Sequence, residues 1–158
     1  MLRRKLTLRA HGRQVVLVKR ENESLRHVLM KAGLWALLLP EHPDLVVEGR
    51  IGDRYAPDLV ALDPAGDPVL WCEAGQVTPR KIASVARRFR AARLIIAKWG
   101  GSLDVHRTVY ERAVADTRRD APVEVWVMPA DESLYVDDDG SVVIDPGTIR
   151  RAVLRTSR

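Results

Sequence analysis

The chain has 158 residues, of which 46% are hydrophobic and 30% charged, so it is long enough to bury a core. No apolar run approaches the roughly 18 residues that a membrane-spanning helix needs, and no apolar segment typical of a secretory signal follows the basic residues 3–5. Cys72 is the only cysteine, which excludes an internal disulfide. We expect one domain over residues 1–158, a cytoplasmic location and no membrane partner.

The net charge of +5 is distributed unevenly along the chain. Residues 1–31 hold nine Lys or Arg against two acids, residues 37–73 hold eight acids against two Arg, and residues 74–103 hold seven basic residues and no acid. An acidic segment between two basic ones fits a metal site that acts on a polyanion such as nucleic acid. A solvated, arginine-rich surface is the simpler alternative reading.

The first third of the chain predicts a hairpin and a helix. Apolar residues at 6, 8 and 15–18 indicate two short strands that turn at His11-Gly12. A helix is expected over residues 22–39, because its apolar positions follow the 3.6-residue period and Pro40 ends it. Residues 45–51 could form a third strand.

The middle of the chain predicts two strands and a helix. Strands at 58–62 and 69–73 flank a turn dense in Asp, Pro and Gly, and Thr78-Pro79 has the cap and first-turn proline that begin a helix. In this helix the buried side is expected to hold Ile82, Val85, Ala86 and Phe89, and the other side Arg80, Lys81, Ser84, Arg87 and Arg88.

The last third predicts a strand at 93–99, a helix at 102–118, strands at 123–127, 134–136 and 142–144 forming a β-meander, and a short helix at 147–154. Cys72 alternates out of phase with Glu73, which indicates a buried core thiol. The order of elements predicts an α/β fold with a central mixed β-sheet flanked by helices, an extra N-terminal hairpin and the C-terminal meander.

Asp58 and Glu73 are the strongest candidates for a site. If the turn centres on Ala65-Gly66, paired residues have numbers that sum to 131, and Asp58 then lies opposite Glu73. Like charges placed so destabilise a sheet, and a divalent cation such as Mg²⁺ or Mn²⁺ offsets the repulsion. Two solvent-facing acids at strand ends are the alternative reading.

The residues around this pair resemble a known family. Pro57-Asp58, then fourteen residues, then Glu73 on an apolar strand and a basic helix, resembles the PD-(D/E)xK nuclease superfamily. The Trp71-Cys-Glu-Ala-Gly75 strand end, and the helix that runs from Glu23 to beyond Trp35, are similar to the YaeQ branch of that superfamily. The resemblance covers residues 21–99 and implies a restriction-endonuclease-like core.

The resemblance also implies roles for single residues. Asp58 and Glu73 would bind the metal, and Glu23 would be an accessory acid from the first helix. Gly75 stands where the superfamily has its catalytic lysine, so we expect Lys81 or Gln76 to position water and phosphate. The basic residues expected to hold a nucleic-acid backbone are Arg80, Arg87 and Arg88.

Two functions follow from these expectations. The first is a Mg²⁺- or Mn²⁺-dependent phosphodiesterase that cleaves DNA or RNA by a metal-activated water. The alternative is a catalytically inactive protein that keeps the nuclease fold and binds nucleic acid or another protein, because a fold does not fix a function.

Overall fold

The computed structural model describes residues 4–129 and 134–157. The elements before the central helix α2 are β1 (Arg4–Ala10), β2 (Arg13–Lys19), α1 (Leu25–Leu38), β3 (Val46–Val47), β4 (Leu59–Leu62) and β5 (Pro68–Ala74). Those that follow are α2 (Pro79–Arg88), β6 (Arg93–Trp99), α3 (Leu103–Val114), β7 (Val123–Met128), β8 (Leu134–Val136), β9 (Val142–Ile144), a 3₁₀ turn (Pro146–Thr148) and β10 (Arg150–Val153). No helix within the described ranges is both long and apolar enough to cross a membrane.

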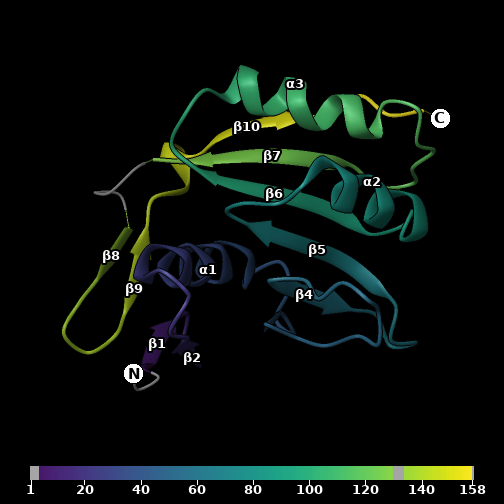
Figure 1. Cartoon of the computed structure of the whole chain (residues 1–158). Coiled ribbons are helices and arrows are strands. Elements are labelled where there is room, and N and C mark those ends of the chain that lie inside the picture. Colours follow the sequence, from purple (N-terminus) through teal and green to yellow (C-terminus); the bar gives the residue numbers. More distant parts are fainter. Residues whose placement is uncertain (1–3, 130–133, 158) are drawn as a thin grey trace.

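A six-stranded mixed sheet in the order β10-β7-β6-β5-β4-β3 forms the centre of the fold (Figure 1). β5, β6 and β7 are parallel, and the outer strands β3, β4 and β10 are antiparallel to their neighbours. The connections that carry α2 and α3 return the chain to the same end of the sheet, as parallel pairing requires. The predicted α/β class with a central mixed sheet is therefore confirmed.

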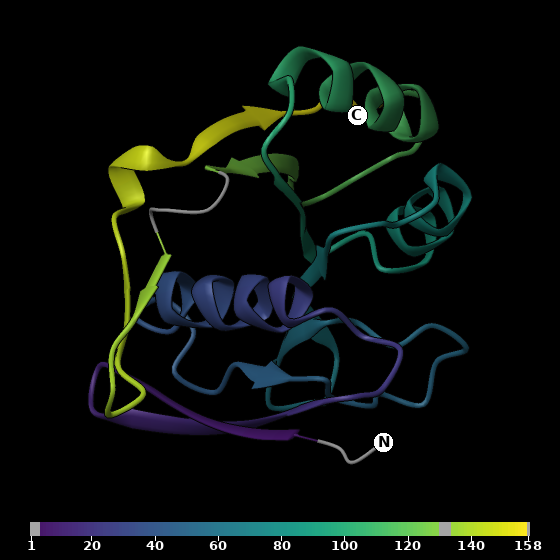
Figure 2. The same cartoon turned by 60° about the vertical axis from the view of Figure 1, so that its left-hand side comes forward.

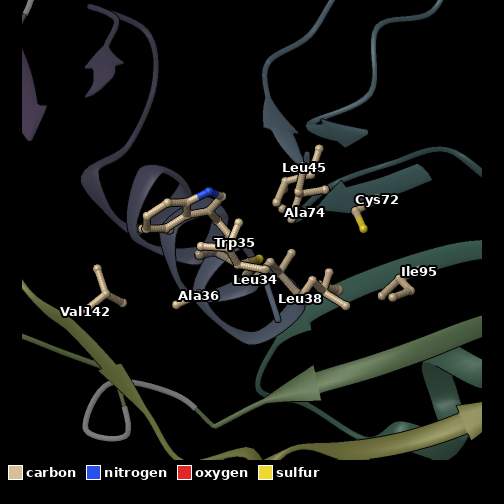
Figure 3. Close-up of a cluster of buried hydrophobic side chains, with 14 of the residues drawn as sticks. Leu34, Trp35, Ala36, Leu38, Leu45, Cys72, Ala74, Ile95 and Val142 are labelled. Atoms are coloured by element: carbon tan, nitrogen blue, oxygen red, sulfur yellow. The ribbon is translucent and has the colours of Figure 1, made fainter. Parts of the chain in front are cut away.

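The sheet is covered on both faces, which explains why its middle strands are mostly apolar. Alternate residues pack in opposite directions, so that Cys72 and Ile95 join the cluster around α1 while Trp71 and Ile96 join the cluster under α2 and α3. Figure 3 shows the first cluster, with Leu34 and Leu38 of α1 gathered near Cys72 and Ile95. The predicted burial of Cys72 is confirmed.

Helix α1 is buried on most of its surface because two hairpins cover the side that the sheet leaves open. The β1-β2 hairpin and the β8-β9 hairpin lie around α1 (Figure 2). Ser24 caps the helix by accepting a hydrogen bond from the His27 backbone N–H. The predicted helix is confirmed, and Leu25 at its first turn is 39% exposed.

The C-terminal strands are divided between two sheets, so the predicted single meander is wrong in its connections. β7 enters the central sheet beside β6, and β8 pairs only with β9 among the described strands. The predicted helix at 147–154 is also wrong. That segment forms a 3₁₀ turn and then β10, whose backbone pairs with β7, and this pairing overrides the local helical preference.

The register of β4 and β5 is the feature that positions the candidate site. Leu59 pairs with Cys72 and Ala61 with Leu70, so the predicted sum of 131 is confirmed over these residues. A bulge then places Leu62 opposite Pro68. The third predicted strand is confirmed only as the two residues of β3, which pair with β4 at the edge of the sheet.

Candidate functional site

A cavity of about 1030 Å³ opens where the start of α1 meets the ends of β5 and β6. Asp58 lines it together with groups that the structure brings from distant parts of the chain, among them Glu23, Lys31, Glu48 and Lys98. Pockets of this size and mixed polarity are the usual place for ligands and substrates in α/β proteins.

Asp58 directly precedes β4, and its carboxylate reaches across to the end of β5. Oδ2 accepts a hydrogen bond of 2.8 Å from the Ala74 backbone N–H and lies 3.8 Å from Nε2 of His27. Burial raises the pKa of the Asp58 carboxyl, but the contacts with His27 and Ala74 outweigh it and leave the pKa below its usual range. Asp58 is therefore ionised at neutral pH.

Glu73 lies next to the last residue of β5 and is 4% exposed. Its Oε1 accepts a hydrogen bond of 3.0 Å from the Trp71 indole and pairs with Nζ of Lys81 at 2.6 Å. Burial raises the pKa of Glu73 and the Asp58 charge raises it further, while Lys81 lowers it, and the result is a pKa above the usual value. The two acids therefore influence each other electrostatically, as their predicted pairing implies.

The two acids nevertheless take their partners from opposite faces of the sheet. His27, beside Asp58, belongs to α1, whereas Lys81, beside Glu73, belongs to α2. Asp58 lines the cavity, and Glu73 is not among the described residues that do. This arrangement keeps each carboxylate next to its own cation.

Glu23 belongs to a buried network on the α1 side. Its Oε2 accepts from Nζ of Lys31 at 2.6 Å and from Nδ1 of His27 at 2.7 Å. Lys31 is 2% exposed and also pairs with Glu48. Burial raises the pKa of Glu23, but the Lys31 ammonium outweighs it and holds that pKa below its usual value.

His27 joins this network to Asp58. Its Nδ1 faces the Glu23 carboxylate, and its Nε2 lies 3.0 Å from the Ala74 carbonyl oxygen. Both partners are acceptors only, so both ring nitrogens donate and the imidazole carries a positive charge. Asp58 is the largest cause that raises the pKa of His27, in agreement with this assignment.

Within the described ranges, no three His, Cys, Asp or Glu side chains lie together in a way that could hold a metal ion. The structure brings Asp58, directly before β4, to the end of β5 where Glu73 lies, whereas Glu23 contacts Lys31 and His27. Two carboxylates with waters are still a usual protein contribution to a Mg²⁺ site.

Lys98, which the sequence did not single out, brings its ammonium group to Gly75, the position where a lysine was expected. Gly75 has φ +87°, and its carbonyl oxygen accepts a hydrogen bond of 2.7 Å from Nζ of Lys98. Lys98 belongs to β6, which runs parallel to β5, and it lines the cavity half-buried. Burial lowers the pKa of Lys98. Gln76 is exposed and lines the same cavity.

The basic residues of α2 are in two different situations. Arg80 and Arg87 are exposed. Arg88 is exposed too, but it makes a bidentate ion pair with Asp53, at 2.5 and 3.2 Å, and is held on the protein. Its guanidinium is therefore less available to a phosphate backbone than those of the other two.

Ser84 is buried rather than exposed, so its predicted place on the solvent side of α2 is wrong. The segment at residues 50–57 covers it, and the Ser84 hydroxyl accepts hydrogen bonds from Arg54 at 3.2 Å and from Arg88 at 3.1 Å. Local periodicity does not reveal this cover, because the covering segment has no regular structure.

Sequence reasoning missed Lys98, His27, Lys31 and Glu48. One signal was present: Glu23, His27 and Lys31 follow each other at intervals of four, which places them on one side of a helix. Lys31 also interrupts an otherwise apolar run. Glu48 and Lys98 had no local signal, because only the folded sheet brings them to the cavity.

The fold and cavity define a mixed α/β protein with a polar site at the ends of its central strands. Among solved structures, the chain is similar to the YaeQ protein from Xanthomonas axonopodis pv. citri, with 17% identity and a TM-score of 0.56 over 98% of this chain and 97% of that one. It is also similar to the YaeQ protein from Pseudomonas syringae, with 15% identity and a TM-score of 0.56 over 95% of this chain and 90% of that one.

At these identities the similarity shows the fold alone, and it confirms the fold that the resemblance to YaeQ proteins implies. No protein-family model and no curated protein sequence matches the chain.

Proposed function

We propose that this chain is a divergent YaeQ-like protein of the PD-(D/E)xK superfamily and hydrolyses phosphodiester bonds in DNA or RNA with the help of Mg²⁺ or Mn²⁺. The observation that carries the proposal is that the pairing of β4 with β5 brings Asp58, which lines a large cavity, near enough to Glu73 for the two charges to interact. The Asp58 charge raises the pKa of Glu73, which is the repulsion that a bound divalent cation would relieve.

In this proposal a hard cation would take its protein ligands from Asp58 and Glu73. The contacts described above use Oδ2 of Asp58 and Oε1 of Glu73, so a cation would be offered the other oxygen of each carboxylate. Oxygen donors of this kind suit Mg²⁺ and Mn²⁺. A bound ion would supply a water of lowered pKa and would stabilise charge on the phosphate.

The remaining groups of the cavity serve the substrate. Lys98 brings a positive charge to the end of β5, where it would bind the phosphate and steady the charge that develops on it. Gln76, exposed at the same edge, would orient a water. Lys81 is held on Glu73 and lowers the pKa of that carboxyl, so it would position the carboxylate rather than bind substrate.

Arg80 and Arg87 would hold the nucleic-acid backbone without reading its sequence, because guanidinium groups on a helix surface contact phosphates. Arg88 would instead anchor the segment at residues 50–57 through Asp53.

The experiment compares wild type with Asp58→Asn, Glu73→Gln and Lys98→Met in plasmid nicking and RNA degradation with Mg²⁺ or Mn²⁺. Each substitution should lower the cleavage rate by roughly 10²-fold or more. Asp116→Asn, at an exposed acid of the α3–β7 loop, is the matched control and should cleave as wild type does. Absence of cleavage by wild type, together with undetectable metal binding, would refute the proposal.

One observation favours the second candidate, a nucleic-acid-binding module without catalysis. Both acids already have a cationic partner, Lys81 for Glu73 and His27 for Asp58, so the site is electrostatically satisfied without metal. Salt-dependent binding of nucleic acid that survives Asp58→Asn and Glu73→Gln, without cleavage by wild type, would support this function.

A further inference from the structure

Lys31 occupies the middle of the acidic side of the cavity. Its side chain is 2% exposed, and its ammonium group contacts the carboxylates of Glu23, at 2.6 Å, and Glu48. Both acids line the cavity with it. A lysine is almost never this buried unless its charge is paired, and here two carboxylates pair with it.

The charges around Lys31 are nearly balanced. Among the groups joined by the contacts above, the cations Lys31 and His27 face the three carboxylates of Glu23, Glu48 and Asp58. One negative charge remains uncompensated. A single divalent ion with one phosphodiester charge would offset this charge, whereas a second divalent ion would add two more positive charges to a partly enclosed space that Lys98 also lines.

The backbone at Glu48 supports a defined place for its carboxylate. Glu48 has φ 59°, a left-handed conformation that costs a non-glycine residue free energy. Its N–H donates a hydrogen bond of 2.8 Å to the Asp58 carbonyl oxygen, and its side chain holds Lys31. The surrounding contacts therefore maintain a strained residue at the point where the Lys31 network meets Asp58.

We propose that the Lys31 ammonium is a built-in counter-cation that fills the Glu23–Glu48 side of the cavity, so that this side binds no divalent ion. The inference rests on the proposed function for its consequence, which is that cleavage uses one metal ion, held by Asp58 and Glu73. Glu23 then acts as a partner of Lys31 and His27 and not as a metal ligand.

The test counts bound Mn²⁺ per chain by equilibrium dialysis, with the unbound ion followed by electron paramagnetic resonance. Wild type should bind one Mn²⁺. Lys31→Met keeps the length of the side chain and removes the charge, so it should bind one more Mn²⁺ than wild type. Adding Glu48→Gln to Lys31→Met should remove that extra ion. Lys5→Met, at an exposed lysine of β1, is the matched control and should match wild type.

The outcomes separate this inference from the proposed function. Two ions bound to wild type, or a folded Lys31→Met that binds no more than wild type, would overturn the role of Lys31. No ion bound to wild type but one bound to Lys31→Met would overturn the proposed metal site and support the role of Lys31. If Lys31→Met does not fold, Glu48→Gln alone decides: unchanged Mn²⁺ affinity supports the inference, and a tenfold loss contradicts it.

Discussion

Removing the charge of Lys81 should destabilise the protein in a way that depends on pH. Lys81→Met leaves the Glu73 carboxylate, 5% exposed in its side chain, without its cation. Loss of one partner of a buried ion pair costs about 3–5 kcal/mol. Lys81 itself is 22% exposed, so water already screens part of the pair and the lower end applies, about 3 kcal/mol at pH 8.

The pH dependence follows from the pKa of Glu73. Burial already raises this pKa in the folded protein. Between the pKa of the unfolded state and that of the folded state, the folded protein therefore holds a proton that the unfolded chain has lost, and stability falls as pH rises through this interval. Lys81 lowers the pKa, so the substitution extends the interval upward. The stability difference between Lys81→Met and wild type should therefore be largest at pH 8 and should shrink as pH falls, because below about pH 4.3 Glu73 is mostly protonated in both the folded and the unfolded state.

Urea unfolding at pH 5 and pH 8 measures this difference. In thermal unfolding at pH 8, the melting temperature should fall by about 6–12 °C, at about 2–4 °C per kcal/mol for a chain of this size. The double variant Glu73→Gln/Lys81→Met has no carboxyl at residue 73 to titrate, so its difference in stability from Glu73→Gln should not change between the two pH values. An equal loss of stability at both pH values in Lys81→Met would refute the reasoning, because a titrating Glu73 could not produce it.

Three further predictions concern groups that the fold holds in place. Gly75→Ala should destabilise the protein by about 1–2 kcal/mol in thermal unfolding, because φ is +87° and the new Cβ would lie 3.4 Å from the His27 ring. The Cys72 thiol is fully buried and burial raises its pKa, so a thiol reagent should react with it at the rate of unfolding, and reaction in native buffer at a free thiol's rate would contradict its placement. Arg119→Met should cost about 3 kcal/mol or more in urea unfolding, because the buried guanidinium donates to three carbonyl oxygens around the end of α2, and a loss under 1 kcal/mol would show that those carbonyls find other donors.

The sequence predicted the pairing of β4 and β5 well because a short turn fixes an antiparallel register. The turn around Ala65-Gly66 places Leu59 opposite Cys72, and that single relation brings Asp58 to the end of β5. Helices α1 and α2 were also predictable, since Ser24 and Thr78 cap them and their apolar residues recur at helical spacing.

Lys98 could not be predicted, because the register between parallel strands depends on how the crossover helix packs and not on a turn. Ser84 and the segment at 147–154 were misread for a related reason. Each was assigned from its local pattern, but a distant part of the chain determines its environment. Residues 50–57 cover Ser84. The segment at 147–154 contains β10, which is a strand because it pairs with β7. Most helices and strands were thus predictable from the local sequence, whereas the places of Lys98 and Glu48 in the candidate site were not.

The β1-β2 hairpin contacts the β8-β9 hairpin, which lies far from it in the sequence. The Arg9 N–H donates to the Gly140 carbonyl oxygen at 2.8 Å, and the Arg9 side chain contacts the Asp139 carbonyl 130 positions away. Closing so long a loop is slow and is rewarded only after the rest of the chain is in place. During synthesis on the ribosome, β1 and β2 emerge before β8 and β9, and they gain this support only when residue 140 has been made. Until then the apolar outer side of α1 lacks half of its cover, and the nascent chain should depend most on chaperones during that interval.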